Sequence, residues 1–586
     1  MCSIIGYCGS RRAAPLLLNG LRRMEYRGYD SAGVATFHDG KISVRKGVGR
    51  VAEVNLAFRL DSLPGGVGIG HTRWATHGGV TEANAHPHVS SSGQVAIVHN
   101  GIIDNHVDLR EMLLEEGYLF RSETDSEVIA NLLQLHYDRT LDVTESIDRT
   151  LAELKGSYAF AAILPDGTLA AARYHEPLIL GMSEDGYFLA SDVLGFVGQT
   201  DKVIYLENRE IVTATNRGIN VCDFEQSPSR HDVIKVSTEV AEVEKGAYVH
   251  YTLKEIFEQP SSILKTARAN EAAVSRAAEV IRQAKAVYLT GSGSSLNAGL
   301  VGKFLLSKYA GLNVEPIVAS EASFSPARFD EDSALIAISQ SGESADVLEA
   351  VAMAKASGAS VVSIVNVESS SLARASSVAV GLNCGPEIGV AATKSFTSQL
   401  TMFLRLSEEL SHGRLSPSYE EASKAVSKIL LESPKVSRIA DEIASVRDIY
   451  VLGVGPHWPI ASEASLKLKE LAYVHAEAIP GGELKHGPLA LLDSLAHVIL
   501  INPSDLTYSN VVASGHEVKA RGAKVIGVSD RPSSNYDLQI EIPEVSQDLL
   551  PLVEVIPLQL LAYHLALKRN TNPDYPRNLA KSVTVK

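Results

Sequence analysis

The second half of the chain carries a degenerate internal repeat, which constrains the fold more than any other feature. "AVYLTGSGSSLNAG" resembles "IYVLGVGPHWPIASE", and "GASVVSIVN" resembles "GAKVIGVSD". The offsets agree, since Gly453 minus Gly291 gives 162 and Gly522 minus Gly358 gives 164. In each copy, apolar runs typical of buried strands alternate with helical patterns. The repeat therefore predicts two doubly wound α/β domains with parallel sheets.

The first 220 or so residues have a different pattern. Short β-rich segments such as "VAIVHNG", "YAFAAIL" and "GYFLASDV" accompany helices such as "VDLREMLLEEG", which predicts one α+β domain. At about 150 residues per domain, a chain of 586 residues suits three or four domains, and we expect three. The expected parts are an α+β domain at 1–223, a connection at 224–262, α/β domains at 263–412 and 430–573, and a tail at 574–586.

Composition excludes several classes of protein. The formal charge of −15 disfavours a nucleic-acid-binding surface, although local basic pockets for small anions stay possible. No window approaches about 18 uninterrupted apolar residues, and no basic flank precedes an apolar segment at the N-terminus, so we expect neither a membrane span nor secretion. The four cysteines lack CxxC spacing, which argues against a disulfide scaffold or a zinc site. We expect a cytoplasmic protein.

The opening "MCSIIGYCG" places Cys2 directly behind the initiator methionine. Removal of Met1 leaves a thiol and a free α-amine on one residue, a nucleophile with its own base, because such an amine has a pKa near 8. The alternative is a small apolar residue that starts a strand.

A thiolate that attacks a carboxamide also needs oxyanion donors and groups that hold the substrate's charges. Asn100 and Gly101 in "VAIVHNGIIDN" offer a side-chain amide and an unencumbered backbone N–H. Arg73 is suited to an α-carboxylate and Asp125 to an α-ammonium. The alternatives are a turn at "HNG", a surface ion pair at Arg73 and a helix cap at Asp125.

Five histidines lie between residues 71 and 99 without an HExxH motif or a cysteine partner. We therefore expect no metal site and interpret them as residues that orient loops. They are His71, His77, His86, His88 and His99.

The N-terminal motifs resemble the class II glutamine amidotransferase domain, an N-terminal-nucleophile (Ntn) hydrolase. The motifs are Cys2, "RRMEYRGYDSAG", "GIGHTRWATHGG", "NAHPHV", "HNGIIDNH" and "SETDSEVIA", in this order. The resemblance implies that Cys2 is the nucleophile, that its α-amine is the base and that Asn100 and Gly101 form the oxyanion hole. It also implies a glutamine site lined by Arg73, Thr76, His77 and Asp125.

Two serine-rich turns follow buried strands in the first repeat, "GSGSS" at 291–295 and "SQSGES" at 339–344. Each leads into a helix, so N–H groups and hydroxyls converge where the helix dipole favours an anion. No GK[ST] follows and GxGxxG is incomplete, so a sugar phosphate suits these turns better than a nucleotide. The alternative is an ordinary N-cap at each turn.

The second repeat reads "GVGPHW" at the first turn and has lost the hydroxyls. Its next helix places Glu463, Lys467 and Glu470 at i, i+4 and i+7 on one face, a pattern that is usually a solvated surface. "ELKHGP" then supplies a titratable His486, and the tail "PRNLAKSVTVK" contains a single internal lysine, Lys581, which suggests a chemical role.

These segments resemble the paired sugar isomerase (SIS) domains of the isomerizing glutamine–fructose-6-phosphate aminotransferase family. The matching motifs are "GSGSSLNAG", "SQSGESADV", "EIGVAATKSFTSQL", "LKLKELAYVHAEA", "GGELKHGPLAL", "PLQLLAYH" and "PRNLAKSVTV", and "HYTLKEIFEQP" matches in the connection. The resemblance implies fructose 6-phosphate and glutamine as substrates, no cofactor, and a homodimer. The implied sugar-phosphate ligands are Ser294, Ser295, Ser339, Gln340, Ser341, Ser344, Val390 and Ala580.

The same resemblance implies the order of events. His486 opens the sugar ring, Lys581 forms a Schiff base with C2 beneath the folded tail, and ammonia from the Cys2 site arrives through a channel gated by Trp74. Glu470 then moves a proton from C1 to C2 while Lys467 stabilises the enolamine, which gives glucosamine 6-phosphate, the first step of hexosamine and UDP-N-acetylglucosamine synthesis.

Three features depart from the family pattern: Ser294 replaces a threonine, Ala392 replaces a common serine, and "YTLKEI" differs in the connection. Two alternatives remain, a non-catalytic regulator that senses sugar phosphates and an amidotransferase with another phosphosugar acceptor.

Overall fold

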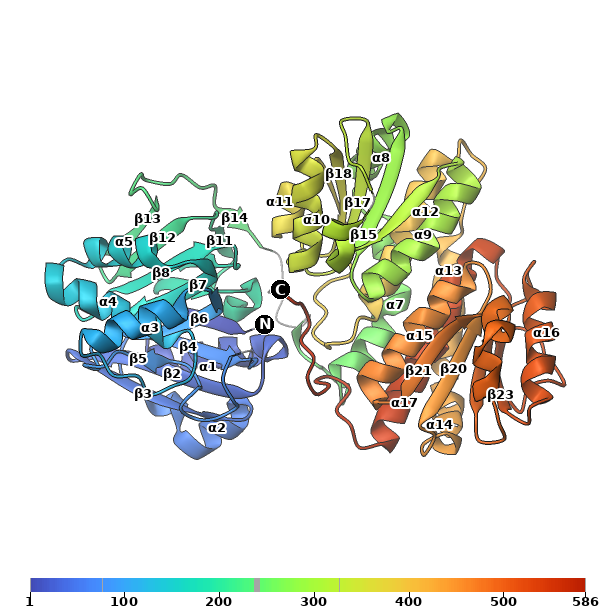
Figure 1. The fold of residues 1–586 in the computed structure, drawn as a ribbon, viewed down its shortest axis with the longest axis horizontal. Coiled ribbons are helices and arrows are strands. Elements are labelled where there is room, and N and C mark those ends of the chain that lie inside the picture. Colours follow the sequence, from blue (N-terminus) through green and yellow to red (C-terminus); the bar gives the residue numbers. More distant parts are fainter. Residues whose placement is uncertain (1, 76, 237–242, 326, 585–586) are drawn as a thin grey trace. The chain divides into compact units, whose positions relative to one another are not determined.

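The computed structural model describes residues 2–75, 77–236, 243–325 and 327–584 of the chain. It divides into two compact units, which we call the first unit (residues 1–244 with 580–586) and the second unit (residues 245–579). Figure 1 shows the ribbon of both units. Each is described by itself below.

Two antiparallel sheets form the first unit. The larger has the order β14-β11-β9-β10-β1-β4-β2-β3, and the smaller has the order β13-β12-β8-β7-β6-β5. The strands of the larger sheet are β1 (Ser3–Gly9), β2 (Ser31–His38), β3 (Lys41–Val48), β4 (Val67–Arg73), β9 (Ile179–Ser183), β10 (Gly186–Ala190), β11 (Lys202–Tyr205) and β14 (Ile234–Lys235). Those of the smaller sheet are β5 (His88–Val89), β6 (Ala96–Ile103), β7 (Gly156–Ile163), β8 (Leu169–Tyr174), β12 (Glu210–Thr215) and β13 (Gly218–Asp223).

The alternation of side chains along β7 explains the layers of this unit. Ala159, Ala161 and Ile163 pack with Ile4 and Ile69 of the larger sheet. The intervening Tyr158, Phe160 and Ala162 point to the opposite face, as the period of two in a strand requires. There they meet a layer of helices, α3 (His106–Glu115), α4 (Glu127–Thr140) and α5 (Val143–Glu153). Helix α1 (Ala13–Met24) packs on β1 and β4, and α2 (Val51–Phe58) packs on β2 and β3. The two sheets therefore lie between helical layers.

The second unit contains two five-stranded parallel sheets. Their orders are β16-β15-β17-β18-β19 and β21-β20-β22-β23-β24, so the first strand of each sheet lies between the second and the third. The strands are β15 (Ala286–Gly291), β16 (Val314–Val318), β17 (Ser333–Ser339), β18 (Ser360–Val365), β19 (Val378–Gly381), β20 (Asp448–Gly453), β21 (His475–Pro480), β22 (His497–Ile501), β23 (Lys524–Ser529) and β24 (Leu538–Glu541). The identical orders confirm the two doubly wound domains that the repeat predicts.

Helices cover both faces of each sheet (Figure 1). On the first sheet, α10 (Ala345–Ala356) and α11 (Ser371–Ala375) lie opposite α8 (Glu271–Gln283), α9 (Ser294–Ala310) and α12 (Lys394–Leu410). On the second, α16 (Tyr508–Lys519) lies opposite α15 (His457–Ala472) and α17 (Leu550–Lys568). One continuous core joins the two sheets through these helices and through α7 (Tyr251–Ala267), α13 (Tyr419–Leu431) and α14 (Ser433–Glu442).

Helix α7 begins at Tyr251, inside the stretch 224–262 for which the sequence predicts a connection, and continues to Ala267. Pro260 lies inside this helix, where it removes one backbone hydrogen bond. Ile256 and Ile263 are fully buried in the core of the second unit. The burial of these two side chains offsets the free energy lost with that hydrogen bond. This explains why a proline, which usually ends a helix, lies inside α7.

Helix α17 belongs to the one segment among the described residues, Gln547–Lys568, that is long and apolar enough to cross a membrane. Its mean hydropathy is 1.6, but 94% of the apolar window is buried inside the structure. Core helices of water-soluble proteins combine these two properties, and α17 packs against α14 and α15 in the same way.

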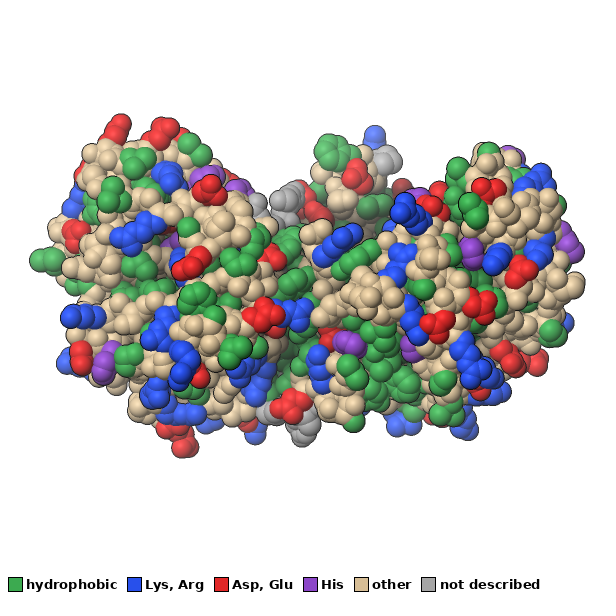
Figure 2. Space-filling model, turned by 90° about the horizontal axis from the view of Figure 1, so that it is seen from below, with side chains coloured by type: hydrophobic (Ala, Val, Ile, Leu, Met, Phe, Trp, Pro, Cys, Tyr) green, Lys and Arg blue, Asp and Glu red, His purple; other side chains and the backbone are tan. Residues whose placement is uncertain are grey.

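Acidic and basic side chains are interspersed on the face of the protein that Figure 2 shows. The chain has 69 acidic and 54 basic residues, so acidic groups are in excess overall. A surface of this kind repels polyanions at long range, and recognition of an anionic substrate then depends on local groups.

Candidate active sites

Cys2 lies directly before β1, with its sulfur against the backbone of Trp74. The Trp74 N–H donates to Cys2 Sγ at 3.3 Å, and the thiol lies 3.6 Å from the Trp74 carbonyl oxygen. Burial raises the pKa of the Cys2 thiol, an effect that the nearby Arg73 guanidinium opposes. The thiol therefore needs a base before it can attack a carbonyl.

Asn100 is oriented toward Cys2 by a buried histidine. Its Nδ2 donates to the Cys2 carbonyl oxygen at 3.1 Å, and Arg27 Nε reaches the same oxygen at 3.4 Å. His71 Nε2 lies 3.2 Å from Asn100 Oδ1 and 2.9 Å from the carbonyl oxygen of His99. Both partners are acceptors, and burial lowers the pKa of His71 to about 3, so the ring is neutral with its proton on Nε2. This arrangement fixes the amide NH₂ of Asn100 on the side of Cys2.

Gly101 follows Asn100 inside β6, so "HNG" forms part of a strand and not a turn. Its φ is +110°, a conformation that favours glycine, and a Cβ atom built there would lie 2.0 Å from the carbonyl oxygen of Ser157. Only glycine fits at this position beside the Asn100 amide.

Arg73 is the last residue of β4 and is only 4% exposed, which rules out a surface ion pair. Its guanidinium donates to the carbonyl oxygens of Gly79 at 3.1 Å and Gly78 at 3.2 Å, and also to that of His77. Burial lowers the pKa of Arg73, and the charges of Cys2, Asp30 and Asp125 oppose this effect. Arg73 thus holds the loop beside the thiol as a largely desolvated cation.

Asp125 is also buried, and its Oδ2 accepts a hydrogen bond of 2.9 Å from the backbone N–H of Ile103 at the end of β6. Helix α4 begins two residues later, at Glu127. The Asp125 carboxylate is thus bound to strand β6 and does not cap α4. His77 has a half-buried ring that meets the His106 ring edge-on, with centroids 5.9 Å apart. Thr76 lies outside the described residues.

The remaining histidines of this region pack together. The His71 and His86 rings lie 4.2 Å apart, and those of His86 and His88 lie 4.4 Å apart. Burial lowers the pKa of each of these three rings, so they are neutral at pH 7. Among the described residues, no group of three or more His, Cys, Asp or Glu side chains is arranged to hold a metal ion.

In the second unit, the two serine-rich turns meet at one edge of the first sheet. β15 ends at Gly291 and α9 begins at Ser294, while the adjacent β17 ends at Ser339 and α10 begins at Ala345. β16 lies on one side of β15 and β17 lies on the other, so the strand order reverses between β15 and β17. Open α/β sheets bind ligands at such a switch point.

The serine hydroxyls at this switch point do not cap the helices. Neither the N-cap of α9 nor that of α10 makes a side-chain capping hydrogen bond. Ser295 Oγ accepts from Gln399 Nε2 at 3.0 Å, and Ser339 Oγ accepts from the Gly342 N–H at 3.0 Å. A hydroxyl oxygen that accepts from the protein can still donate its own proton to an anion. Ser344 Oγ lies 3.3 Å from Ser339 Oγ, and Ser341 Oγ accepts from the Glu343 N–H at 3.2 Å.

The residues Glu463, Lys467 and Glu470 on α15 are not a solvated face. Glu463 is 0% exposed and Lys467 is 1% exposed. Lys467 Nζ lies 3.4 Å from Glu463 and 2.5 Å from Glu470. Burial opposes the charge of Lys467, but the two carboxylates prevail and raise its pKa above the ordinary value. Lys467 is therefore an ammonium group, suited to hold Glu470 and to stabilise negative charge.

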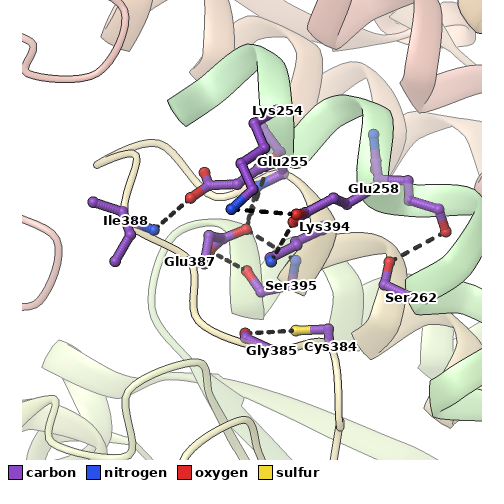
Figure 3. A network of polar contacts seen from close by, with 12 residues as sticks. Lys254, Glu255, Glu258, Ser262, Cys384, Gly385, Glu387, Ile388, Lys394 and Ser395 are labelled. Carbon is purple, nitrogen blue, oxygen red and sulfur yellow. Dashed lines mark hydrogen bonds and ion pairs between the residues drawn. The ribbon is translucent and has the colours of Figure 1, made fainter. Parts of the chain in front are cut away.

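The loop that carries Val390 is fixed to α7 by buried carboxylates (Figure 3). Glu255 of α7 accepts from the backbone N–H groups of Ile388 and Gly389. Within the loop, Glu387 accepts from the N–H groups of Thr393 and Ser395, both at 3.0 Å. Just after the loop, Lys394 forms an ion pair of 2.6 Å with Glu258 of α7, which secures its second end. Ala392 lies in this same loop.

Four predicted site residues remain: His486, Gln340, Ala580 and Lys581. His486 ends the 3-10 helix η5 (Gly481–His486) with an exposed ring, and no hydrogen bond or ion pair to it is found among the described residues. Ala580 and Lys581 belong by their contacts to the first unit and are half-buried. Gln340 lies in the turn after β17, where its carbonyl oxygen accepts from the Asn366 N–H at 3.1 Å.

Sequence reasoning missed His457, the first residue of α15. It aligns with Ser295 of the first repeat, since 457 minus 295 gives the offset of 162. Its ring is fully buried, 2.9 Å from Glu554 through Nδ1 and 2.9 Å from Asp505 through Nε2. Although burial acts in the opposite direction, these carboxylates raise the pKa of His457 to about 10. The signal was a histidine in "GVGPHW" at the position that Ser295 has in the first repeat.

Comparisons with known proteins identify the same parts. The SIS domain family matches residues 280–407 and 442–569, and the glutamine amidotransferase domain family matches residues 71–197. The glutamine–fructose-6-phosphate aminotransferases [isomerizing] of Pyrococcus horikoshii and Aquifex aeolicus are 40% and 41% identical to the chain, and each alignment covers 100% of both sequences. The solved C-terminal domain of glucosamine-fructose-6-phosphate aminotransferase from Francisella tularensis is similar with a TM-score of 0.52 and 33% identity, covering 57% of this chain and 99% of that chain.

Proposed function

The chain belongs to the isomerizing glutamine–fructose-6-phosphate aminotransferase family, and from this we propose how its residues divide the reaction. It converts D-fructose 6-phosphate and L-glutamine to D-glucosamine 6-phosphate and L-glutamate, the first step of hexosamine synthesis. The amidotransferase part releases ammonia from glutamine, and the isomerase part transfers it to the sugar.

Cys2 is the proposed nucleophile of the glutaminase half. Its thiolate attacks the glutamine carboxamide, and the negative charge on the tetrahedral oxygen is stabilised by Asn100 Nδ2 and the Gly101 N–H. Because burial raises the thiol pKa, a base must take the proton, and the α-amine freed by removal of Met1 is in position on the same residue. Ammonia leaves, a thioester remains, and water hydrolyses it to glutamate.

The side chains around this thiol are proposed to bind the charged groups of glutamine. Arg73 is a desolvated cation suited to the α-carboxylate, and Asp125 is a buried anion suited to the α-ammonium. We assign Thr76 and His77 to the same site. Trp74, whose backbone contacts Cys2 Sγ, is the proposed gate for ammonia on its internal route.

The serines at the switch point are the proposed phosphate site of the isomerase half. Ser295, Ser341 and their neighbours offer hydroxyl donors at the N-termini of α9 and α10, and the helix dipoles favour the dianion. The full set is Ser294, Ser295, Ser339, Gln340, Ser341, Ser344, Val390 and Ala580.

The chemistry at C1 and C2 is assigned to four residues. His486 protonates the ring oxygen as the ring opens, and Lys581 forms an imine with C2 and releases water. Ammonia displaces Lys581 to give the imine of the sugar. Glu470 removes a proton from C1 and returns it to C2, and the ammonium of Lys467 stabilises the enolamine between these steps.

We further propose a cytoplasmic homodimer that uses no metal or cofactor and binds neither nucleic acid nor membrane. Light scattering of the purified protein tests the oligomeric state, with a mass of twice 62.8 kDa expected.

One observation carries the proposal: the Glu463, Lys467 and Glu470 ladder, in which Glu463 and Lys467 are buried, contacts the first serine turn through Ser294. A regulator that only senses a sugar phosphate needs the hydroxyls but has no use for this ladder. Incubation with glutamine and fructose 6-phosphate should form glutamate and glucosamine 6-phosphate in equal amounts. Phosphate binding without product would support the regulator, and amination of a phosphoribosyl compound alone would support the other acceptor.

A further inference from the structure

Asp574, seven residues before Lys581, lies at a junction of three segments of the second unit. It is 1% exposed. Its Oδ1 accepts from the backbone N–H of Thr252 at 2.9 Å and from the Thr252 hydroxyl at 3.1 Å. Its Oδ2 forms an ion pair of 2.9 Å with Lys245, and its backbone carbonyl oxygen accepts from the Val390 N–H at 3.1 Å. Asp574 thus contacts three parts of the second unit: the start of α7, the first residue of the unit (Lys245) and the loop that carries Val390.

The contact with Thr252 caps helix α7 from a distant part of the chain. The N-cap residue, His250, makes no side-chain capping hydrogen bond at the start of α7. Asp574 supplies the carboxylate from 322 residues away in sequence. A negative charge at the N-terminus of a helix also interacts favourably with the helix dipole. The position of Asp574 relative to α7 is therefore closely fixed.

The loop of the sugar site is held by the same two elements. Three consecutive backbone N–H groups are bound: those of Ile388 and Gly389 by Glu255 of α7, and that of Val390 by the carbonyl oxygen of Asp574. Glu255 is 2% exposed, so this bonding is shielded from water. The backbone at Val390 thus depends on α7 and Asp574 together.

Residues on both sides of Asp574 are bound to the end of α15, the helix that carries the Glu463, Lys467 and Glu470 ladder. The Thr571 hydroxyl donates to the Leu471 carbonyl oxygen at 2.6 Å. The Arg577 N–H donates to the Tyr473 hydroxyl at 2.6 Å, and the Arg577 guanidinium lies 4.3 Å from the centre of the Tyr473 ring. Asp574 lies between these two attachments and links them to α7.

We propose that Asp574 is a positioning residue for the sugar half-reaction: it fixes the base of the tail that carries Lys581 and the loop that carries Val390 to the first turn of α7. This inference rests on the proposed roles of Lys581 and Val390. Asp574 touches neither substrate in this assignment, and it acts through the residues that it holds.

The test compares Asp574→Ala, which loses every side-chain contact, with Asp574→Asn, which keeps an acceptor for Thr252 but loses the ion pair with Lys245. Borohydride added with fructose 6-phosphate, in the absence of glutamine, traps a sugar imine on Lys581 that mass spectrometry measures. Formation of glucosamine 6-phosphate gives the sugar half-reaction, and glutamate release without sugar gives the glutaminase. Asp441→Asn is the matched control, because it removes a carboxylate from an exposed ion pair with Lys568 in the same unit.

We expect Asp574→Ala to lower both imine trapping and the synthase kcat by about 10- to 100-fold, because small displacements of reacting groups have effects of this size. Asp574→Asn should retain more of both, while glutaminase activity without sugar stays within about twofold in every variant, as for Asp441→Asn. Wild-type trapping and kcat in Asp574→Ala would overturn the inference. A parallel loss of glutaminase would also overturn it, because it would indicate a general folding defect. If the wild-type protein itself forms neither adduct nor amino sugar, the proposed function fails instead.

Discussion

The hydroxyl of Ser294 donates a hydrogen bond of 2.9 Å to Glu463, and this contact joins the first α/β repeat to the second. Asn297, one turn further along α9, donates to the other oxygen of the same carboxylate at 3.0 Å. Glu463 in turn lies beside Lys467. The serine turn that is proposed to bind phosphate is therefore connected, through one buried carboxylate, to the ammonium that is proposed to assist proton transfer.

Removal of Lys467 should be costly because it leaves Glu463 buried and unpaired. Breaking a buried ion pair from one side destabilises a protein by about 3–5 kcal/mol. We expect Lys467→Met to lower the free energy of unfolding by an amount in this range, and the double variant Glu463→Gln, Lys467→Met to recover part of it. Urea unfolding measures both. Lys469→Met, an exposed change on the same helix, is the control, and equal stability of Lys467→Met and wild type would contradict the pair's importance.

Cys2→Ala should abolish glutamate release, with a loss of at least about 10³-fold, because it removes the proposed nucleophile of the covalent step. Binding of fructose 6-phosphate, measured by calorimetry, should be unchanged. Cys8→Ala is the control, since Cys8 lies in β1, the strand that follows Cys2, and is buried in the core between the sheets. Residual glutaminase near the wild-type rate would remove Cys2 from the mechanism.

Ser295→Ala combined with Ser341→Ala removes two hydroxyl donors to a charged group, each worth about 1.5–3 kcal/mol. Affinity for fructose 6-phosphate should fall by roughly 10²-fold or more, while glutaminase without sugar should change little. Ser363→Ala is a matched control, because Ser363 is buried in β18 of the same sheet and its hydroxyl has no partner in the described part of the chain. Equal losses of both activities would indicate misfolding and contradict the assignment.

His457→Gln should destabilise the protein in a pH-dependent way. The pKa of His457 is about 10 in the folded state, above its ordinary value of 6.5, so its contribution is complete below pH 6.5 and is lost as the pH rises toward 10. The difference in melting temperature between wild type and His457→Gln should therefore be largest near pH 6 and should shrink by pH 10. His475→Gln, at an exposed ring, is the control. A difference that grows with pH would contradict a charged His457.

The sequence predicted the parts of the structure that depend on local periodicity. The repeat gave two parallel sheets, and the spacing of Glu463, Lys467 and Glu470 placed them on one side of a helix. It did not reveal that this side is buried, because burial depends on the packing of α9 against α15, which has no local signal. The capping of α7 by Asp574 was unpredictable for the same reason, since its partners are 322 residues apart. At Pro260 the local signal was misleading, because tertiary packing of Ile256 and Ile263 outweighs a helix breaker.

The two parallel sheets share one strand order, but the turn before α9 and the equivalent turn before α15 differ in the negatively charged group that each one faces. In the first repeat, the turn before α9 is proposed to offer donors to the phosphate of the substrate. In the second, His457 stands at the position of Ser295, and the protein's own carboxylates, Asp505 and Glu554, lie against it. At this turn of the second repeat, side chains of the protein thus supply the negative charge that a bound phosphate is proposed to supply in the first repeat. The proposed phosphate site therefore belongs to the first repeat, and in the second repeat the start of α15 is held by carboxylates of the protein itself.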